Sequence, residues 1–193
     1  MNIYVIGPRD EKPLNGEVIN TTSRSRTWSR SLSPFFLGPC KLYDSNVGKN
    51  VENSYQYCKV YKCHLNDYGE PNASYFEWRD KGWADHRANR YPMGKGSKPE
   101  YSYWLGCKLS YIEARKEIYI PIYYEAVRHT PAFTTLQMEY LCGDKDIYLW
   151  DFDGYNHKEL GMTYDEVVNC ETKKMGHAFV LAMILEGKIE KYV

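Results

Sequence analysis

The longest helical pattern in this chain of 193 residues runs from Ser110 to His129. Apolar residues recur along it at the spacing of one helix face, but Pro121 lies in its middle. Proline lacks a backbone N–H and its ring clashes with the preceding turn, so the helix must bend or divide there. Every other patterned segment is shorter, which predicts a domain built from several short elements.

Capping and turn residues define the other expected helices. Thr130-Pro131 is typical of the start of a helix, which would run to about Leu141, because threonine caps helices and proline suits their first turn. Thr163 and Glu166 have the spacing of a capping box at the start of a short helix. Three further helices are expected over residues 51–65, 72–82 and 175–186.

Strands are expected in three places. Residues 146–150 form an apolar run typical of a buried strand, and residues 35–43 predict a short strand and turn. Residues 2–6 and 17–21 are joined through Asn15-Gly16, a turn sequence that predicts an N-terminal β-hairpin.

The sequence contains no linker, repeat or low-complexity tract, so a single domain over residues 1–193 is the simplest organisation. The hairpin and a basic loop would occupy residues 1–30, and the main core residues 31–187. The predicted fold class is α+β, mainly helical with a few short strands.

The charge balance excludes one class of function. The sequence has 25 Lys and Arg residues against 25 Asp and Glu residues, so bulk charge cannot bind nucleic acid, although local patches can. Aromatic residues make up 16% of the chain and include 19 tyrosines. Tyrosine suits both a stacking pocket and an aromatic core, and composition alone leaves these two explanations open.

The sequence carries no signal for membrane insertion or metal binding. It has no apolar run of the roughly 18 residues that a membrane span needs, and its first residues lack the pattern of a signal peptide. The six cysteines include no Cys-x-x-Cys pair, and the five histidines show no ligand spacing. We therefore expect no metal site and a reduced, cytoplasmic protein without membrane contact.

The segment from Val51 to Tyr61 is the most informative one for chemistry. On a helix, Glu52, Gln56 and Lys59 would form one narrow polar stripe, while tyrosine, valine and cysteine cover the remaining surface. A carboxylate, an amide and an ammonium group within reach of one another can line a cavity. An exposed Glu–Lys pair, worth about 0.3 kcal/mol on a helix surface, explains the same pattern.

The segment from Arg90 to Lys98 is a second candidate, since it combines two glycines with three cations. Backbone N–H groups near Gly94, together with Arg90 and Lys95, could wrap a phosphate. A surface loop without a ligand is the alternative.

Asp151 and Asp153 form a third candidate because they directly follow the expected strand 146–150. Carboxylates at the end of a strand often bind ribose hydroxyls or act in catalysis. A turn built from aspartate and glycine is the alternative.

Taken in order, these segments resemble motifs of the NADAR family, named for NAD and ADP-ribose, which includes YbiA-like N-glycosidases. The family's helix motif Glu-His-x-x-Gln-x-x-Lys is similar to the segment from Glu52 to Lys59, with Asn53 in place of histidine. Its Met-Gly-Arg and Asp-Trp motifs are similar to Met93-Gly94-Lys95 and Tyr103-Trp104. Further matching segments are Leu32-Ser33-Pro34-Phe35, Gly143-Asp144 and Lys173-Lys174-Met175-Gly176.

The resemblance implies a YbiA-like fold and cleavage of an N-glycosidic bond to ribose, without a cofactor. Glu52 would stabilise an oxocarbenium-like state or protonate the leaving base, and Lys59 would hold Glu52 ionised or attack C1 of the ribose. Asp153 would bind ribose hydroxyls or orient water, and Trp104 would stack on the base or ribose. The other implied substrate-binding residues are Gln56, Arg90, Gly94, Lys95, Asp151 and Lys174.

The implied substrate contains ADP-ribose. The leading expectation is a glycohydrolase that removes ADP-ribose from a modified nucleobase, with guanine in DNA favoured. Such an enzyme would counteract a DarT-type toxin or act as a phage anti-defence protein. ADP-ribosylated DNA would then be its partner. The alternatives are an N-glycosidase for small nucleotide or riboflavin-pathway intermediates and a non-catalytic sponge for ADP-ribose.

Overall fold

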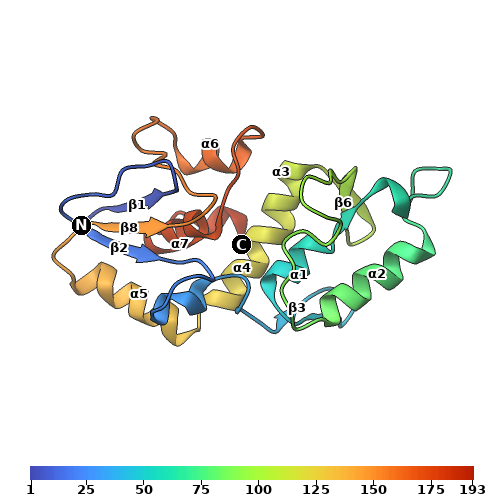
Figure 1. Ribbon diagram of the computed structural model, residues 1–193, viewed down its shortest axis with the longest axis horizontal. Coiled ribbons are helices and arrows are strands. Elements are labelled where there is room, and N and C mark those ends of the chain that lie inside the picture. The colour runs from blue at the N-terminus through green and yellow to red at the C-terminus, as the bar shows by residue number, and fades with distance from the viewer.

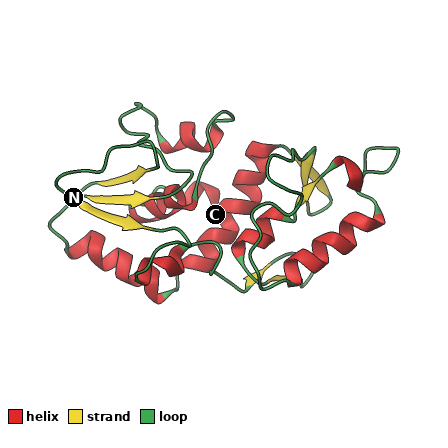
Figure 2. Cartoon of the chain, viewed as in Figure 1, coloured by secondary structure: helices red, strands yellow, loops and turns green.

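A long, bent helix separates the chain into two halves in the computed structural model, which describes residues 1–193 (Figure 1). The helix consists of α3 (Tyr111–Ala114), the π-turn η3 (Arg115–Tyr119) and α4 (Ile120–Val127). A three-stranded sheet with its helices lies on one side, and further helices with short strands lie on the other (Figure 2). One cluster of 32 buried apolar residues draws side chains from both halves, so they form a single α+β domain.

The π-turn that divides this long helix confirms the predicted effect of Pro121. Pro121 lies in the first turn of α4, directly after the π-turn. There the N–H of Ile120 donates to the carbonyl of Arg115, five residues back, so the backbone accommodates the proline without ending the helix. Arg115 and Tyr119, both on the π-turn, line the space between the two halves.

The sheet places β8 (Ile147–Trp150) between β1 (Ile3–Ile6) and β2 (Glu17–Asn20), and both outer strands run parallel to it. The predicted N-terminal hairpin is therefore wrong, whereas the predicted buried strand is confirmed. The reason is that β8 fills the space between the two N-terminal strands and satisfies the hydrogen-bonding groups of both. The turn at Asn15-Gly16 instead ends a loop that brings the chain back to the start of the sheet.

Three helices surround this sheet. α7 (His177–Leu185) lies behind it and is buried along most of its length (Figure 1). α5 (Pro131–Cys142) and α6 (Tyr164–Asn169) lie below and above the sheet in the same view. Thr130 caps α5 and Thr163 caps α6, as their sequence patterns predict.

The predicted helix over residues 51–65 is much shorter in the structure. α1 (Val51–Gln56) is followed by the strand β5 (Lys59–Val60). β5 pairs with β6 (Tyr101–Trp104), which in turn pairs with β7 (Cys107–Leu109). The backbone groups of β5 are thus satisfied by a strand far along the chain, a pairing that no local pattern reveals.

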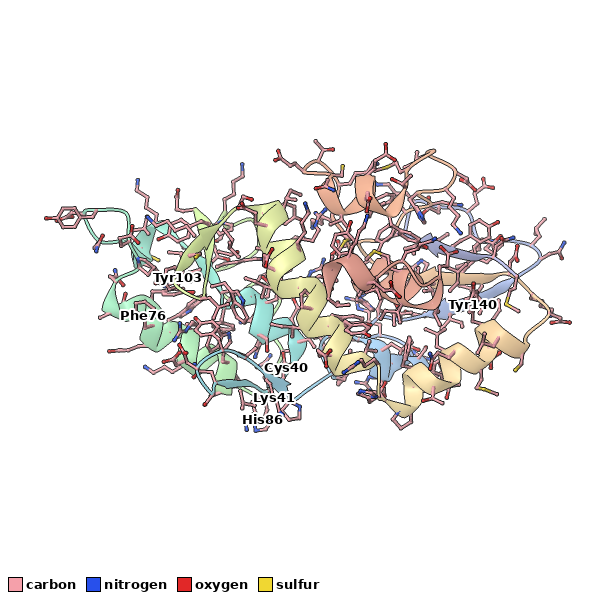
Figure 3. All side chains as sticks on the ribbon, turned by 180° about the vertical axis from the view of Figure 1, so that it is seen from behind. Cys40, Lys41, Phe76, His86, Tyr103 and Tyr140 are labelled. Carbon is pink, nitrogen blue, oxygen red and sulfur yellow. The ribbon has the colours of Figure 1, made fainter.

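An aromatic cluster fills the half around α2 (Ala73–Ala84). The guanidinium of Arg79 lies 4.4 Å from the ring centroid of Trp83 and 5.1 Å from that of Phe76. Phe76 packs against Tyr103, with ring centroids 5.8 Å apart (Figure 3). Part of the high aromatic content therefore serves core packing.

Short elements complete the fold. They are the 3₁₀ helices η1 (Trp28–Leu32), η2 (Lys62–His64) and η4 (Glu190–Tyr192), and a ladder of β3 (Cys40–Lys41) and β4 (Val47–Gly48). None of the helices combines the length and the apolarity that crossing a membrane requires.

Candidate active site

A cavity of about 590 Å³ lies between the two halves. Its walls come from α1, the bent helix, the loop after α2, and the segments that follow β2 and β8 and precede α7. Segments from distant parts of the sequence thus meet in one concave space, which is the common location of a ligand site.

Three polar side chains form a chain of hydrogen bonds on the cavity wall. Nε2 of Gln56 donates to Oε1 of Glu52 at 2.9 Å, and Nζ of Lys59 donates to Oε1 of Gln56 at 2.6 Å. The predicted stripe is preserved although α1 ends at Gln56, because β5 starts close enough for Lys59 to reach back. Only 7% of Glu52 is exposed, so the alternative of an exposed surface pair is wrong.

The start of α1 holds Glu52 in place. Asn50 caps the helix by accepting a hydrogen bond from the N–H of Asn53, and the N–H of Glu52 donates to the carbonyl of Pro34 at 3.0 Å. Glu52 therefore lies in the first turn of the helix, where the exposed N–H dipoles favour a negative charge.

Burial changes the protonation of both charged members of this chain. Desolvation raises the pKa of Glu52 above its usual range, while the hydrogen bond from Gln56 and the charges of Arg90 and Lys59 oppose the rise. Desolvation lowers the pKa of Lys59 to about 8, and the charge of Glu52 opposes that fall. Burial thus shifts both groups toward their neutral forms, and a pKa of about 8 leaves part of the Lys59 amine neutral near neutral pH, as nucleophilic chemistry requires.

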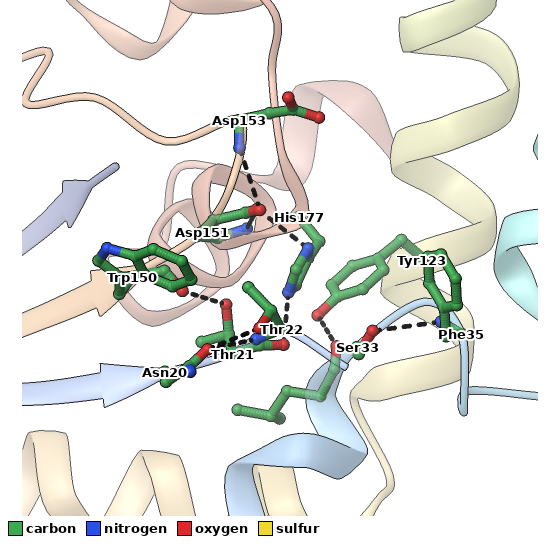
Figure 4. Close-up of polar contacts among 12 residues, drawn as sticks. Asn20, Thr21, Thr22, Ser33, Phe35, Tyr123, Trp150, Asp151, Asp153 and His177 are labelled. Atoms are coloured by element: carbon green, nitrogen blue, oxygen red, sulfur yellow. Dashed lines mark hydrogen bonds and ion pairs between the residues drawn. The ribbon is translucent and has the colours of Figure 1, made fainter. Parts of the chain in front are cut away.

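A second buried pair, Asp151 and His177, lies on the opposite wall (Figure 4). Nδ1 of His177 donates to Oδ2 of Asp151 at 3.0 Å, and Nε2 donates to the carbonyl oxygen of Thr21 at 2.8 Å. Because both ring nitrogens face acceptors, the contacts hold His177 as an imidazolium ion. The N–H of Ala178 also donates to Oδ2 of Asp151, at 3.2 Å.

The pKa values of this pair move apart in the direction expected for an ion pair. Burial is the largest single effect on His177 and would lower its pKa, but the charge and hydrogen bond of Asp151, the hydrogen bond to Thr21 and the charge of Glu52 together outweigh burial, and the pKa is raised. Burial is also the largest single effect on Asp151 and would raise its pKa, but the charge and hydrogen bond of His177 and the hydrogen bonds from the N–H groups of Ala178 and Asp153 together outweigh burial, and the pKa falls to about 2. A Cβ atom on Gly176 would lie 2.0 Å from Oδ2 of Asp151, so the close approach of α7 to this carboxylate requires glycine.

Asp153 links three segments at the same cavity. It forms an ion pair with Arg90 from the loop after α2, and its Oδ1 lies 3.8 Å from Nζ of Lys174. The neighbouring ring of Phe152 lies 5.2 Å below the guanidinium of Arg24.

Cations outnumber carboxylates along the cavity wall. The cations are Arg24, Lys59, Arg90, Arg115, Lys174 and the imidazolium of His177, and the carboxylates are Glu52, Asp151 and Asp153. A chain with no net charge therefore concentrates positive charge in one cavity. Such a cavity favours an anionic ligand.

Tyrosines supply the flat surfaces of the cavity. The rings of Tyr55 and Tyr119 lie 5.0 Å apart, and Nζ of Lys59 lies 4.7 Å from the ring centroid of Tyr55. Desolvation raises the pKa of Tyr119 far above its usual value, so its hydroxyl stays neutral. Tyrosine thus contributes to a pocket as well as to the core, and both explanations of the composition hold.

The cavity brings together most of the residues that the sequence and the resemblance single out, namely Glu52, Gln56, Lys59, Arg90, Gly94, Asp151, Asp153 and Lys174. Trp104 and Lys95 do not line it. Trp104 is not positioned to stack on a ligand in the cavity, because β6 directs its ring against Tyr43, with ring centroids 4.6 Å apart in the aromatic cluster. Lys95 is exposed on a loop whose neighbouring glycines, Gly94 and Gly96, line the cavity instead.

Several cavity residues escaped the sequence-based prediction: His177, Tyr119, Phe35, Phe152 and Arg24. His177 is the first residue of an apolar helix. Nothing in the sequence around it indicates that it contacts Asp151, 26 positions earlier. Arg24 belongs to the basic loop noted in the sequence, but only the fold directs that loop to the cavity.

No group of three or more His, Cys, Asp or Glu side chains is arranged to hold a metal ion. No family model matches this sequence, and no curated protein or solved structure shows significant similarity to it. The chemistry of the cavity is therefore the basis for a functional proposal.

Proposed function

We propose that this protein is a divergent NADAR-type N-glycosidase with a YbiA-like fold, which cleaves the bond between C1 of a ribose and a base nitrogen. The favoured reaction removes ADP-ribose from a modified nucleobase, with guanine in DNA as the first candidate. Such a reaction would reverse the modification made by a DarT-type toxin.

The observation that carries this proposal is the hydrogen-bonded chain of Glu52, Gln56 and Lys59 on the wall of a cationic cavity. A buried carboxylate beside an amine of lowered pKa supports chemistry at a carbon that becomes positively charged. The surrounding cations suit the two phosphates of ADP-ribose, and the tyrosines suit its flat and hydroxyl-bearing groups.

The direct route uses Glu52 and a water molecule. As the C–N bond stretches, positive charge develops on C1 and the ring oxygen, and the ionised carboxylate of Glu52 stabilises it. The bonding electron pair leaves with the base nitrogen, which takes up a proton from the solvent. Water then adds its oxygen to C1 and releases a proton, while Asp153 orients the water or binds the ribose hydroxyls.

A covalent route uses Lys59 as the nucleophile. The neutral amine forms a bond to C1 while the C–N bond to the base breaks, and the base leaves with a proton. The ribose ring then opens to a Schiff base, which water hydrolyses to give the free sugar and the amine. The pKa of about 8 leaves part of the Lys59 population neutral at pH 7.5, as this route needs.

The test combines the pure protein with a DNA oligonucleotide that carries ADP-ribosylated guanine, and mass spectrometry follows loss of the ADP-ribose. We expect loss with the wild-type protein and none with Glu52→Gln. Glu77→Gln is the matched control, because Glu77 is an exposed carboxylate on α2 with no ion pair. Loss that persists in Glu52→Gln would remove Glu52 from the mechanism.

A small substrate is the second candidate, and the zero net charge of the chain favours it over a polymer. The same assay with free nucleotides and riboflavin-pathway intermediates tests this alternative. Binding of ADP-ribose without any product over hours would instead identify a non-catalytic sponge.

A further inference from the structure

The loop between α2 and β6 runs along one side of the cavity. Its cavity-lining residues are Arg90, Tyr91, Gly94, Gly96, Ser97 and Pro99. The stretch from Gly94 to Glu100 is also exposed to solvent. A long loop that has no helix or strand of its own and lines a cavity is commonly a functional cover.

Asn53 fastens the first end of this loop to α1. Its Nδ2 donates to the carbonyl oxygens of Asp85 and Arg87, both at 3.0 Å, and its Oδ1 accepts from the N–H of Asn89 at 2.8 Å. Asn53 is completely buried and uses its amide entirely on the loop backbone. The residue in the position of the family's histidine thus holds the loop immediately before Arg90.

The other end is held by the N–H of Glu100, which donates to the carbonyl of Val60 at 2.8 Å. Between the two ends the loop bonds to itself. The hydroxyl of Ser97 donates to the carbonyl of Met93 at 2.5 Å, and Gly94 and Gly96 both have φ near 92°, where glycine is favoured.

Across the cavity, the loop makes one polar contact with the opposite half, the ion pair between Arg90 and Asp153. The side chains of Arg90 and Asp153 are 28% and 25% exposed, so water has partial access to the pair. Lys174 lies 3.8 Å from the same carboxylate and can keep Asp153 paired when Arg90 leaves.

We propose that residues 90–99 form a lid over the cavity, latched by the ion pair of Arg90 and Asp153, and that Asn53 is the positioning residue that sets the lid. A ligand phosphate competes with Asp153 for Arg90. An anionic substrate would therefore break the ion pair of Arg90 with Asp153 and form its own ion pair with Arg90. The lid itself follows from contacts within the chain, whereas the exchange by a phosphate rests on the proposed function.

Amide hydrogen exchange on the ligand-free protein tests the latch. We expect Asp153→Asn to speed exchange of residues 91–97 at least fivefold, with the helices α5 and α7 unchanged. The charge reversal Arg90→Asp with Asp153→Arg should restore slow exchange. Lys108→Gln is the matched control, because it breaks an exposed ion pair with Glu70 elsewhere in the same half.

Trypsin gives an independent measure of the same opening. It cleaves after Lys95, whereas Pro99 protects the bond after Lys98. Cleavage after Lys95 should accelerate in Asp153→Asn and slow again in the charge-reversed pair. Equal exchange and equal cleavage in the wild type and in Asp153→Asn would overturn the latch.

Asn53→Asp tests the positioning role, because it removes the Nδ2 amide that donates both hydrogen bonds and keeps the size of the side chain. We expect faster exchange confined to residues 85–97 and at least tenfold weaker binding of free ADP-ribose, measured by calorimetry. An even rise in exchange over the whole chain would show that Asn53 is only structural. Local opening without any ADP-ribose binding in the wild type would support the lid and contradict the proposed ligand.

Discussion

Nδ1 of His177 lies 3.0 Å from Oδ2 of Asp151, and the opposite nitrogen of the same ring lies 2.8 Å from the carbonyl oxygen of Thr21. These two contacts join the end of β8, the start of α7 and the segment after β2 at the cavity wall. They predict an imidazolium that persists above pH 6.5, the usual pKa of histidine.

Nuclear magnetic resonance titration of the histidine rings checks this prediction. The His177 signals should keep the shifts of the charged ring as the pH rises through 6.5. His157 is the internal contrast, because burial lowers its pKa to about 4 and it should stay neutral down to that pH. A neutral His177 at pH 6.5 would contradict the assignment.

The same pair predicts how stability depends on pH. The contribution of His177, whose pKa is raised, is complete below pH 6.5 and is lost as the pH rises through its folded value. The contribution of Asp151 to stability is complete above its usual pKa of 3.8 and is lost as the pH falls through about 2. Asp151→Asn should therefore lower the free energy of unfolding most between about pH 4 and 6.5, by about 3 kcal/mol, as measured by urea unfolding.

Glu52→Gln should abolish turnover while the melting temperature changes by no more than about 4 °C, equivalent to about 1 kcal/mol. The amide keeps the shape and the contact with Gln56 but cannot carry the negative charge. Loss of that charge should also lower the pKa of Lys59 further below its value of about 8, because Glu52 now opposes that fall. Titration of isotope-labelled lysine would show no such decrease if the two groups were uncoupled.

Lys59 has a specific test of its covalent role. If its amine attacks C1, borohydride should reduce the Schiff base and leave the sugar attached to Lys59, and the rate should rise with pH up to about 8. Lys59→Arg should lose both trapping and turnover, whereas the exposed Lys62→Arg should keep both. Turnover without trapped sugar would favour the direct route.

Trp104→Ala should reduce stability and leave ligand binding intact. The ring is half-buried and packs against Tyr43 at 4.6 Å and Trp83 at 6.4 Å, away from the cavity. We expect a loss of about 2–3 kcal/mol in the free energy of unfolding. Tyr68→Ala, at a residue that is 88% exposed, is the control and should cost little. Weaker ADP-ribose binding at unchanged stability would instead show that Trp104 contributes to the ligand site.

Arg115→Met should destabilise the protein by about 3 kcal/mol, because the guanidinium ties α6 to the bent helix. Its Nη1 donates to the carbonyls of Val167, Val168 and Cys170, and its Nη2 donates to that of Lys173. Methionine keeps the length of the side chain but removes these four hydrogen bonds, while the carbonyl of Val167 keeps the bond that it accepts from the N–H of Cys170. Chemical denaturation measures the loss, and a change below about 0.5 kcal/mol would mean that water replaces the arginine.

The sequence predicted those parts of the fold that depend on neighbouring residues. Thr130 and Thr163 cap helices through the backbone a few positions ahead, and Pro121 acts on the turn that contains it. The strand before Asp151 was evident because its apolar residues are contiguous. Each of these features can be predicted from the local sequence, since the residues that interact lie within one helical turn or one strand.

The stripe of Glu52, Gln56 and Lys59 was predicted correctly for a partly wrong reason. The assumed helix ends at Gln56, yet the strand that follows keeps Lys59 within hydrogen-bond distance of Gln56. Backbone pairing with β6 replaced the helix, because a strand from far along the chain was available to satisfy those groups.

Local sequence is enough to define the helix caps, the interruption before α4, the buried strand and the residue types at the site. Long-range contacts were needed to establish that β8 separates the N-terminal strands, that His177 meets Asp151 and that Arg90 crosses the cavity to Asp153. Those contacts join residues far apart in the sequence. They form only because one shared core buries apolar side chains from both halves, and that burial sets the distances between them.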